Sequence, residues 1–101
     1  MRTREERGGT YESKTLSVAN GTTNYDVHNT GGMFVNDNAY GFLTLKSDKA
    51  VTIRLNATAN DEISLDVNVW YEFEHIILSN FYITNASGAG ATIPVILDER
   101  I

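Results

Sequence analysis

Residues 51–56 read VTIRLN, and in this stretch apolar side chains alternate with polar ones. The same period of two runs through ISLDVNVW at residues 63–70, and it returns at Ile93, Val95 and Leu97. Successive side chains of a β-strand point to opposite faces of a sheet, so this period is typical of a strand with one buried face. The three stretches therefore predict an all-β fold.

The rest of the chain predicts further strands separated by turns. Asn, Gly, Ser and Asp cluster between the candidate strands, and these residues favour turns. The Asn20-Gly21 pair is the strongest signal for a two-residue hairpin. Seven or eight short strands at spacings near ten residues indicate an antiparallel β-sandwich of jelly-roll-like form. The predicted strands are 15–19, 24–28, 41–46, 51–56, 63–73, 76–84 and 92–97.

Two local features modify this pattern. Pro94 lacks an N–H donor, so we expect the last strand at a sheet edge or paired on one side only. The stretch WYEFEHIILSNFYIT at residues 70–84 is apolar at both odd and even positions. Either a covered outer face or a contact with another subunit would explain it, because aromatic residues are enriched at interface cores. The candidate interface residues are Trp70, Tyr71, Ile76, Leu78 and Tyr82.

The chain length fits one domain, and we assign residues 10–101 to a single sandwich. Residues 1–9, MRTREERGG, have no apolar face and predict a flexible arm. The arm is either a disordered tail or a segment that orders on a neighbouring subunit. In the second case Arg2, Arg4 and Arg7 would make the attachment.

Composition excludes several classes of function. The chain has no cysteine, so disulfides and thiolate chemistry are absent. The net charge is −5, with +1 on the first seven residues and −6 on the remainder, which argues against a surface that binds nucleic acid. No apolar run approaches a membrane span, and the N-terminus lacks the apolar region of a signal peptide. We therefore expect synthesis in a cytoplasm and no membrane partner.

No arrangement of residues predicts catalysis, a cofactor or a metal. Asp26 and His28 would share a strand face, as would Glu72 and Glu74, but two polar residues on a solvated face explain each pair. The sequence NDNAYG at residues 36–41 only superficially resembles a calcium loop. The acidic turn NDE at residues 60–62 could hold a weakly bound Ca²⁺, but a simple turn explains it. A carbohydrate site stays open as an alternative, because the rings of Trp70, Tyr71 and Tyr82 could stack on sugars.

Two long segments carry a family resemblance. TLKSDKAVTIRLNATANDEISL at residues 44–65 and FEHIILSNFYITNASGAGATIPVIL at residues 73–97 resemble small β-sandwich virion proteins of tailed bacteriophages. The shared features are an apolar strand, a turn of small residues and a short final strand. The resemblance covers both capsid decoration proteins and tail or collar components. It implies an acidic, oligomeric structural protein of the virion that has no active site, and it transfers no catalytic residue.

Two functions follow as expectations. The first is a homo-oligomeric decoration protein, with a trimer favoured, that attaches to a major capsid protein or another virion protein and stabilises the shell. The second is a carbohydrate- or receptor-binding module of the tail or surface adhesin type. The first predicts that the aromatic strand meets a second subunit, whereas the second predicts exposed and clustered rings.

Overall fold

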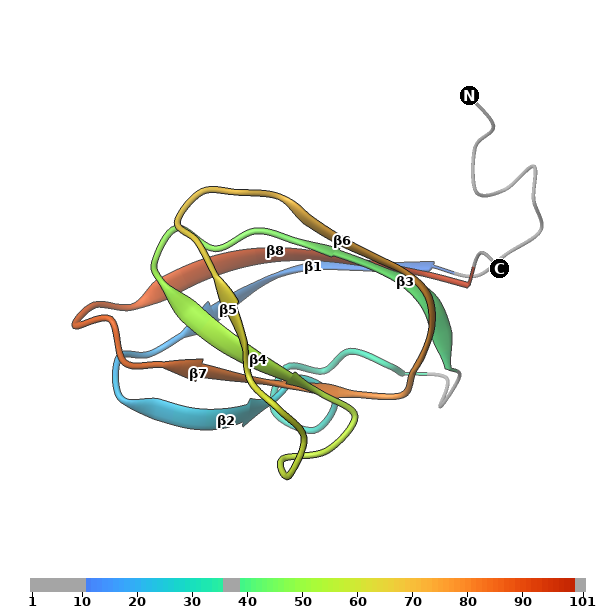
Figure 1. Cartoon of the computed structure of the whole chain (residues 1–101), viewed down its shortest axis with the longest axis horizontal. Helices are drawn as coiled ribbons and strands as arrows, with labels where there is room; N and C mark the ends of the chain where they lie inside the picture. Colours follow the sequence, from blue (N-terminus) through green and yellow to red (C-terminus); the bar gives the residue numbers. More distant parts are fainter. Residues whose placement is uncertain (1–10, 36–38, 100–101) are drawn as a thin grey trace.

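The computed structural model describes residues 11–35 and 39–99, and these residues form eight strands and no helix (Figure 1). The strands are β1 (Tyr11–Val18), β2 (Thr22–Asp26), β3 (Tyr40–Leu45), β4 (Val51–Leu55), β5 (Ile63–Leu65), β6 (Tyr71–Leu78), β7 (Phe81–Asn85) and β8 (Ala91–Asp98).

The strands form two four-stranded sheets that face each other (Figure 1). One sheet has the order β1-β8-β3-β6 and the other has the order β2-β7-β4-β5. Every pairing is antiparallel. Consecutive strands mostly lie in opposite sheets, which is the arrangement of a double-sheet jelly roll. The predicted fold class, an antiparallel β-sandwich of about seven or eight strands, is confirmed.

The space between the sheets is filled with apolar side chains. The alternation in β4 directs Val51 and Ile53 inward, and β8 contributes every second residue from Ala91 to Leu97. At the centre the ring of Phe34 packs edge-on against Tyr40 and Phe81, with centroids 5.7 and 6.3 Å apart. Burial of these apolar side chains is the main force that holds the two sheets together.

Two predicted strands were too long. The alternation at residues 63–70 ends as a strand at Leu65, and Asn68 turns the chain with a φ of 60°. The apolar stretch 76–84 is divided at Ser79–Asn80 into β6 and β7, which belong to different sheets. Side chains make this second corner: Asn56 Oδ1 accepts from Ser79 N at 2.8 Å, and Asn80 Oδ1 accepts from Phe81 N at 2.8 Å. Short polar side chains that bond the backbone favour turns even inside an apolar sequence.

The hairpin predicted at Asn20-Gly21 is wrong. Gly21 does adopt a positive φ of 83°, but the chain passes there from one sheet to the other. The buried side chain of Asn85 holds this corner, because its Nδ2 donates to Val18 O at 2.9 Å while Gly21 N donates to its backbone O at 2.7 Å. A turn signal identifies where the chain reverses, but not whether the flanking strands pair.

The edge position predicted from Pro94 is also wrong, because β8 lies between β1 and β3. Pro94 stands opposite Thr15 of β1, and its carbonyl accepts from Lys46 N at 3.3 Å. β3 ends at Leu45, so the missing N–H of Pro94 falls where the ladder between β3 and β8 stops. A central strand tolerates proline there because at most one bond is lost, at the end of the ladder.

Candidate functional site

The double apolar pattern of the 70–84 stretch has a local cause in β6. His75 has a φ of 58°, and the register between β3 and β6 shifts at this point. The bulge reverses the parity of the strand: Tyr71 and Phe73 pack against the core before it, and Ile76 and Leu78 face the core after it. Odd and even apolar residues therefore serve the same face, so neither of the two predicted explanations is needed for β6.

The structure disperses the candidate interface residues. Leu78 is fully buried in the core, and Tyr71 and Ile76 are half-buried against it. Tyr82 lies half-buried on β7 in the other sheet, and Trp70, 49% exposed, precedes β6. Of the five, Trp70 alone presents a large apolar surface to solvent.

The exposed apolar residues of the described chain gather in part on the loop between β5 and β6. This loop, residues 66–70, carries Val67, Val69 and Trp70, each between 43% and 49% exposed. Lys46 Nζ lies 5.2 Å from the centroid of the Trp70 ring, within range of a cation–π contact. Asp66 N donates to Tyr71 Oη at 2.9 Å and anchors the loop to the start of β6.

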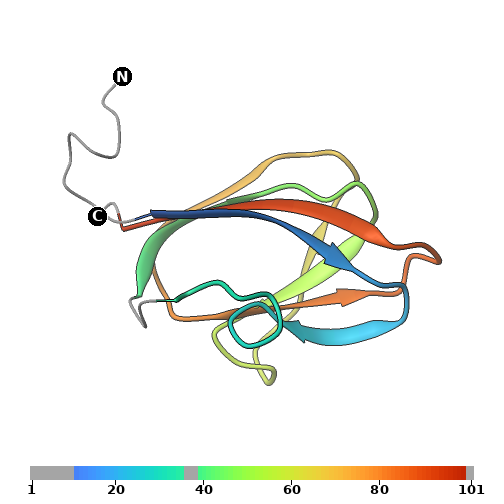
Figure 2. The same cartoon turned by 180° about the vertical axis from the view of Figure 1, so that it is seen from behind.

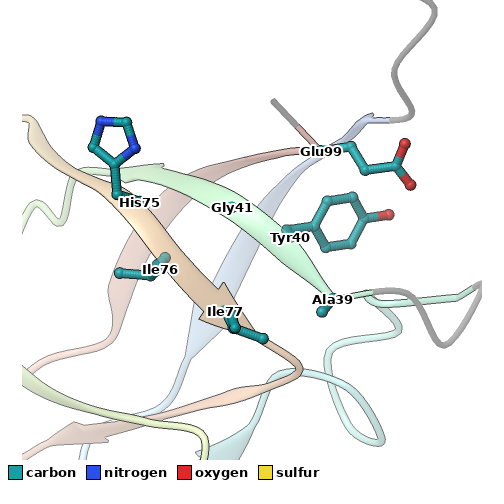
Figure 3. Close-up of a pocket in the computed structure, with 7 residues that line it drawn as sticks. All are labelled: Ala39, Tyr40, Gly41, His75, Ile76, Ile77 and Glu99. Atoms are coloured by element: carbon teal, nitrogen blue, oxygen red, sulfur yellow. The ribbon is translucent and has the colours of Figure 1, made fainter. Parts of the chain in front are cut away.

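A second feature is an open pocket of about 450 Å³ where β6 departs from β3 (Figure 3). The pocket lies beside the register shift between β3 and β6, and Ile77 at its margin is 80% exposed. The imidazole of His75 and the carboxylate of Glu99 lie at opposite ends of the view, so they do not form an acid–base pair (Figure 3). The pocket is lined by Ala39, Tyr40, Gly41, His75, Ile76, Ile77 and Glu99.

Tyr40, which lines this pocket, stabilises the fold. Its side chain is buried, and its hydroxyl donates to the carboxylate of Glu12. Burial raises the pKa of the Tyr40 phenol, and the hydrogen bond to Glu12 and the negative charges of Glu12 and Glu99 raise it further. The phenol therefore stays protonated at neutral pH and acts as a donor that ties β3 to β1.

The Asp26–His28 pair does not form a catalytic dyad. Asp26 Oδ1 accepts from the backbone N–H of His28 at 3.1 Å, from that of Asn29 at 2.9 Å and from Asn80 Nδ2 at 2.9 Å. The His28 ring instead packs edge-on against Phe34, at 6.5 Å between centroids. Partial burial raises the pKa of Asp26, but these hydrogen bonds outweigh it and hold that pKa below its ordinary value. The carboxylate organises the loop after β2.

The remaining acidic candidates are held by structural contacts or lie apart. Glu72 and Glu74 are exposed on β6 opposite Thr44 and Phe42. Glu62 Oε2 accepts from Thr52 Oγ1 at 2.9 Å and lies 3.5 Å from Arg54 Nη2. Within residues 11–35 and 39–99, no group of three or more His, Asp or Glu side chains is placed to hold a metal ion.

Two predictions concern residues that lie wholly or partly outside the described ranges. The proposed attachment residues Arg2, Arg4 and Arg7 lie outside the described residues, and so do residues 36–38 of the 36–41 sequence. In the part of the chain that the structure describes, no helix is long and apolar enough to cross a membrane.

Sequence reasoning missed the inward side of β1. Glu12 and Lys14 lie on the same face as Leu16 and Val18, where Glu12 accepts from Tyr40 and Lys14 Nζ donates to Gly31 O. Their even spacing with the two apolar residues was the available signal. Glu12 is half-buried and Lys14 is exposed, so these two residues bond to the rest of the fold at the margin of the core.

Comparisons with known proteins support the fold alone. No protein-family model matches the chain, and no curated protein matches it. A de novo designed double-stranded β-helix is similar in structure, with a TM-score of 0.55, 14% identity, 87% of this chain covered and 99% of that chain. A structure described as FeII HppE in complex with substrate has a TM-score of 0.55 and 13% identity, covering 86% of this chain and 45% of that one. Likeness at these identities concerns the arrangement of strands, so it assigns neither iron nor a substrate to this chain.

Proposed function

We propose that this chain is a non-enzymatic structural protein of a virion, most simply a homo-oligomeric decoration protein on an assembled phage capsid. The observation that carries the proposal is the filled space between the sheets. Side chains such as Ile53, Phe81, Ile83 and Leu97 have no exposed surface. Within the described residues the space between the sheets is packed with side chains, and the pocket beside β6 is open to solvent, whereas enzyme sites commonly enclose their substrate.

The exposed apolar surface supports a binding role. Val67, Val69, Trp70 and Ile77 are each at least 43% exposed at the two ends of β6. Apolar groups of this size on a surface are typical of protein contacts when they gather together. The resemblance of residues 44–65 and 73–97 to phage virion proteins adds the class of assembly.

Oligomeric state and attachment to shells test this proposal. We expect the purified chain to form a defined oligomer by size-exclusion chromatography with light scattering. We also expect it to co-sediment with capsids of its own phage and to raise their resistance to heat. Deleting residues 1–9 should leave the fold intact and weaken the attachment. A chain that stays monomeric at high concentration and binds no shell contradicts the proposal.

A carbohydrate-binding function is the second candidate, and the exposure of Trp70 favours it. The ring is available to stack on a sugar, and Asp66 and Asn68 on the same loop offer polar groups for hydroxyls. Tyr82 is in the other sheet and Tyr71 packs against the core, so the platform would consist of Trp70 and the loop around it.

Glycan-array binding separates the two functions. The carbohydrate function predicts binding that is lost in Trp70→Ala while the fold is retained. Val69→Ala is the matched control, because Val69 lies on the same loop with similar exposure but has no ring. Absence of glycan binding together with binding to shells supports the structural function.

A further inference from the structure

The two sheets end in four edge strands: β1 and β6 in one sheet, β2 and β5 in the other. An edge strand has a row of backbone N–H and C=O groups that can pair with another chain, and natural proteins usually block such edges. The four edges of this protein differ in how they are blocked.

Three edges carry recognisable blocking features. β5 has only three residues. β2 has a register shift, with Asn24 at a φ of 53°. β6 is broken by the bulge at His75, carries exposed Glu72 and Glu74, and is capped by Asn56, whose Nδ2 donates to Ile77 O at 2.9 Å. Short length, bulges and charges are known devices against edge pairing.

β1 is neither short nor bulged, and its two charged side chains are bonded within the same chain. Its eight residues pair with β8 in continuous register, without a bulge, a proline or a positive φ. Its outward residues Ser13, Thr15 and Ser17 are exposed and uncharged. Its two charged residues, the half-buried Glu12 and the exposed Lys14, lie on the same face as Leu16 and Val18 and bond to Tyr40 and Gly31. Among the described strands none pairs with the other side of β1, which forms the margin of its sheet (Figure 2).

We propose that β1 is the pairing site for a second copy of this chain, joined antiparallel about a two-fold axis at Thr15. The inference rests on the homo-oligomeric part of the proposed function and specifies its interface. The sheet that contains β1 in one copy would then continue into the same sheet of the second copy. A strand that pairs with itself gives an isologous dimer, which differs from the trimer expected from the resemblance.

Charge and register favour a second copy in this position. With Thr15 at the axis, Ser13 lies opposite Ser17 of the partner subunit, and Lys14 lies opposite Leu16 of the partner subunit. Moving the axis to Lys14 would place two lysines face to face, which is unfavourable. The net charge of −5 and the carboxylates of β6 repel other approaches between copies, whereas the outward face of β1 is neutral.

Single cysteines test this arrangement directly, because the chain contains no native cysteine. Directly opposite Cβ atoms in an antiparallel pair are about 5 Å apart, close enough for a disulfide after a small adjustment. Thr15→Cys should therefore form a disulfide-linked dimer under mild oxidation. Ser13→Cys alone should not, since two copies of residue 13 are separated by about 13 Å along the strands. A mixture of Ser13→Cys and Ser17→Cys should cross-link to the heterodimer.

The matched control is Ser64→Cys, an exposed position on the blocked edge β5. We expect Thr15→Cys to cross-link on the order of 100-fold faster than this control at micromolar protein, because pairing raises the local thiol concentration to millimolar. Equal rates for Thr15→Cys and Ser64→Cys overturn the proposal. Cross-linking of Thr15→Cys to an added virion protein in place of a second copy also overturns it, because the occupant would then be another protein.

Light scattering on charge variants separates this inference from the proposed function. Ser13→Glu/Ser17→Glu places like charges opposite each other and should convert the dimer to monomer, whereas Ser13→Glu/Ser17→Lys should restore it. An oligomer that is unaffected by the first variant refutes the β1 interface but leaves the structural function standing. A wild-type monomer that binds no shell refutes both.

Discussion

β1 and β6 lie at opposite margins of the same sheet and have the same length, but they end the sheet in different ways. β6 is interrupted by a bulge and carries two exposed glutamates, whereas β1 runs without interruption beside β8. The bulge also turns Leu78 into the core and leaves Ile77 exposed. The regular strand β1 is therefore the edge that we propose for pairing with another chain, whereas the bulge and the charges of β6 protect that edge from pairing.

The largest expected effect is a loss of stability in core variants of β1 and β6, and it tests whether both strands pack on the same core. Leu16 of β1 and Leu78 of β6 are at most 1% exposed, so Leu16→Ala and Leu78→Ala should each lower the free energy of unfolding by about 3 kcal/mol. Ile77→Ala, next to Leu78 but 80% exposed, should cost less than about 0.5 kcal/mol. Denaturant unfolding measures all three. If Leu78→Ala lowered the free energy of unfolding only slightly, Leu78 would not be a core residue and would again be a candidate for the subunit interface.

The next effect concerns the loop beside β1. Asp26 accepts from His28, Asn29 and Asn80, and the loop that it organises bonds to Lys14 of β1 through Gly31. Asp26→Ala should therefore lower stability by about 2 kcal/mol. Hydrogen exchange should become faster in β1 and stay unchanged in the first half of β6. Equal acceleration in both strands would mean that the loop does not support β1 selectively.

The same carboxylate predicts a pH dependence. The folded-state pKa of Asp26 lies below its ordinary value of about 3.9, so its contribution to stability is complete above that pH. The contribution is lost as the pH falls through the folded-state pKa. Asp26→Asn should flatten the acid side of the stability profile. A profile that is identical in wild type and variant would contradict this role.

The bulge itself gives a smaller effect. His75 has a φ of 58°, a conformation that costs a residue with a side chain about 1 kcal/mol. His75→Gly should stabilise the protein by up to about 1 kcal/mol, and His75→Val should destabilise it by about as much. Thermal unfolding measures both. A more stable valine variant would mean that the bulge is dispensable and that β6 could straighten into a second open edge.

The smallest effect is expected on the 66–70 loop. Trp70 contacts Lys46 at an exposed position, so Trp70→Ala should cost less than about 1 kcal/mol. Trp70 is the single tryptophan, and its fluorescence emission should resemble that of a solvated ring in the folded protein. A strong blue shift in the concentrated protein would place this loop in a subunit contact and would compete with β1 as the interface.

Much of the fold could be predicted from the sequence, and the errors share a cause. Of the residues assigned to a buried face, those in β4 and β8 are buried, namely Val51, Ile53, Ile93, Val95 and Leu97. Val67 and Val69 were assigned in the same way but are exposed, because the strand ends at Leu65. The strands and faces of residues 70–84 were predicted less well, because a bulge and a corner interrupt this stretch. Apolar residues on both parities look like two buried faces when the strand is assumed to be straight.

The all-β class and the buried face of the regular strands could be predicted from local pattern in the sequence by itself, since a period of two depends only on local backbone geometry. The sequence also marked the turns, because Asn and Gly reach positive φ at low cost. Only the tertiary structure decided which strands are neighbours: β1 pairs with β8 at the other end of the chain, and β1 and β2 separate into different sheets. Pairing depends on contacts between distant segments, and no local pattern encodes them. For the same reason, only the fold could reveal that the polar strand β1 is an open edge.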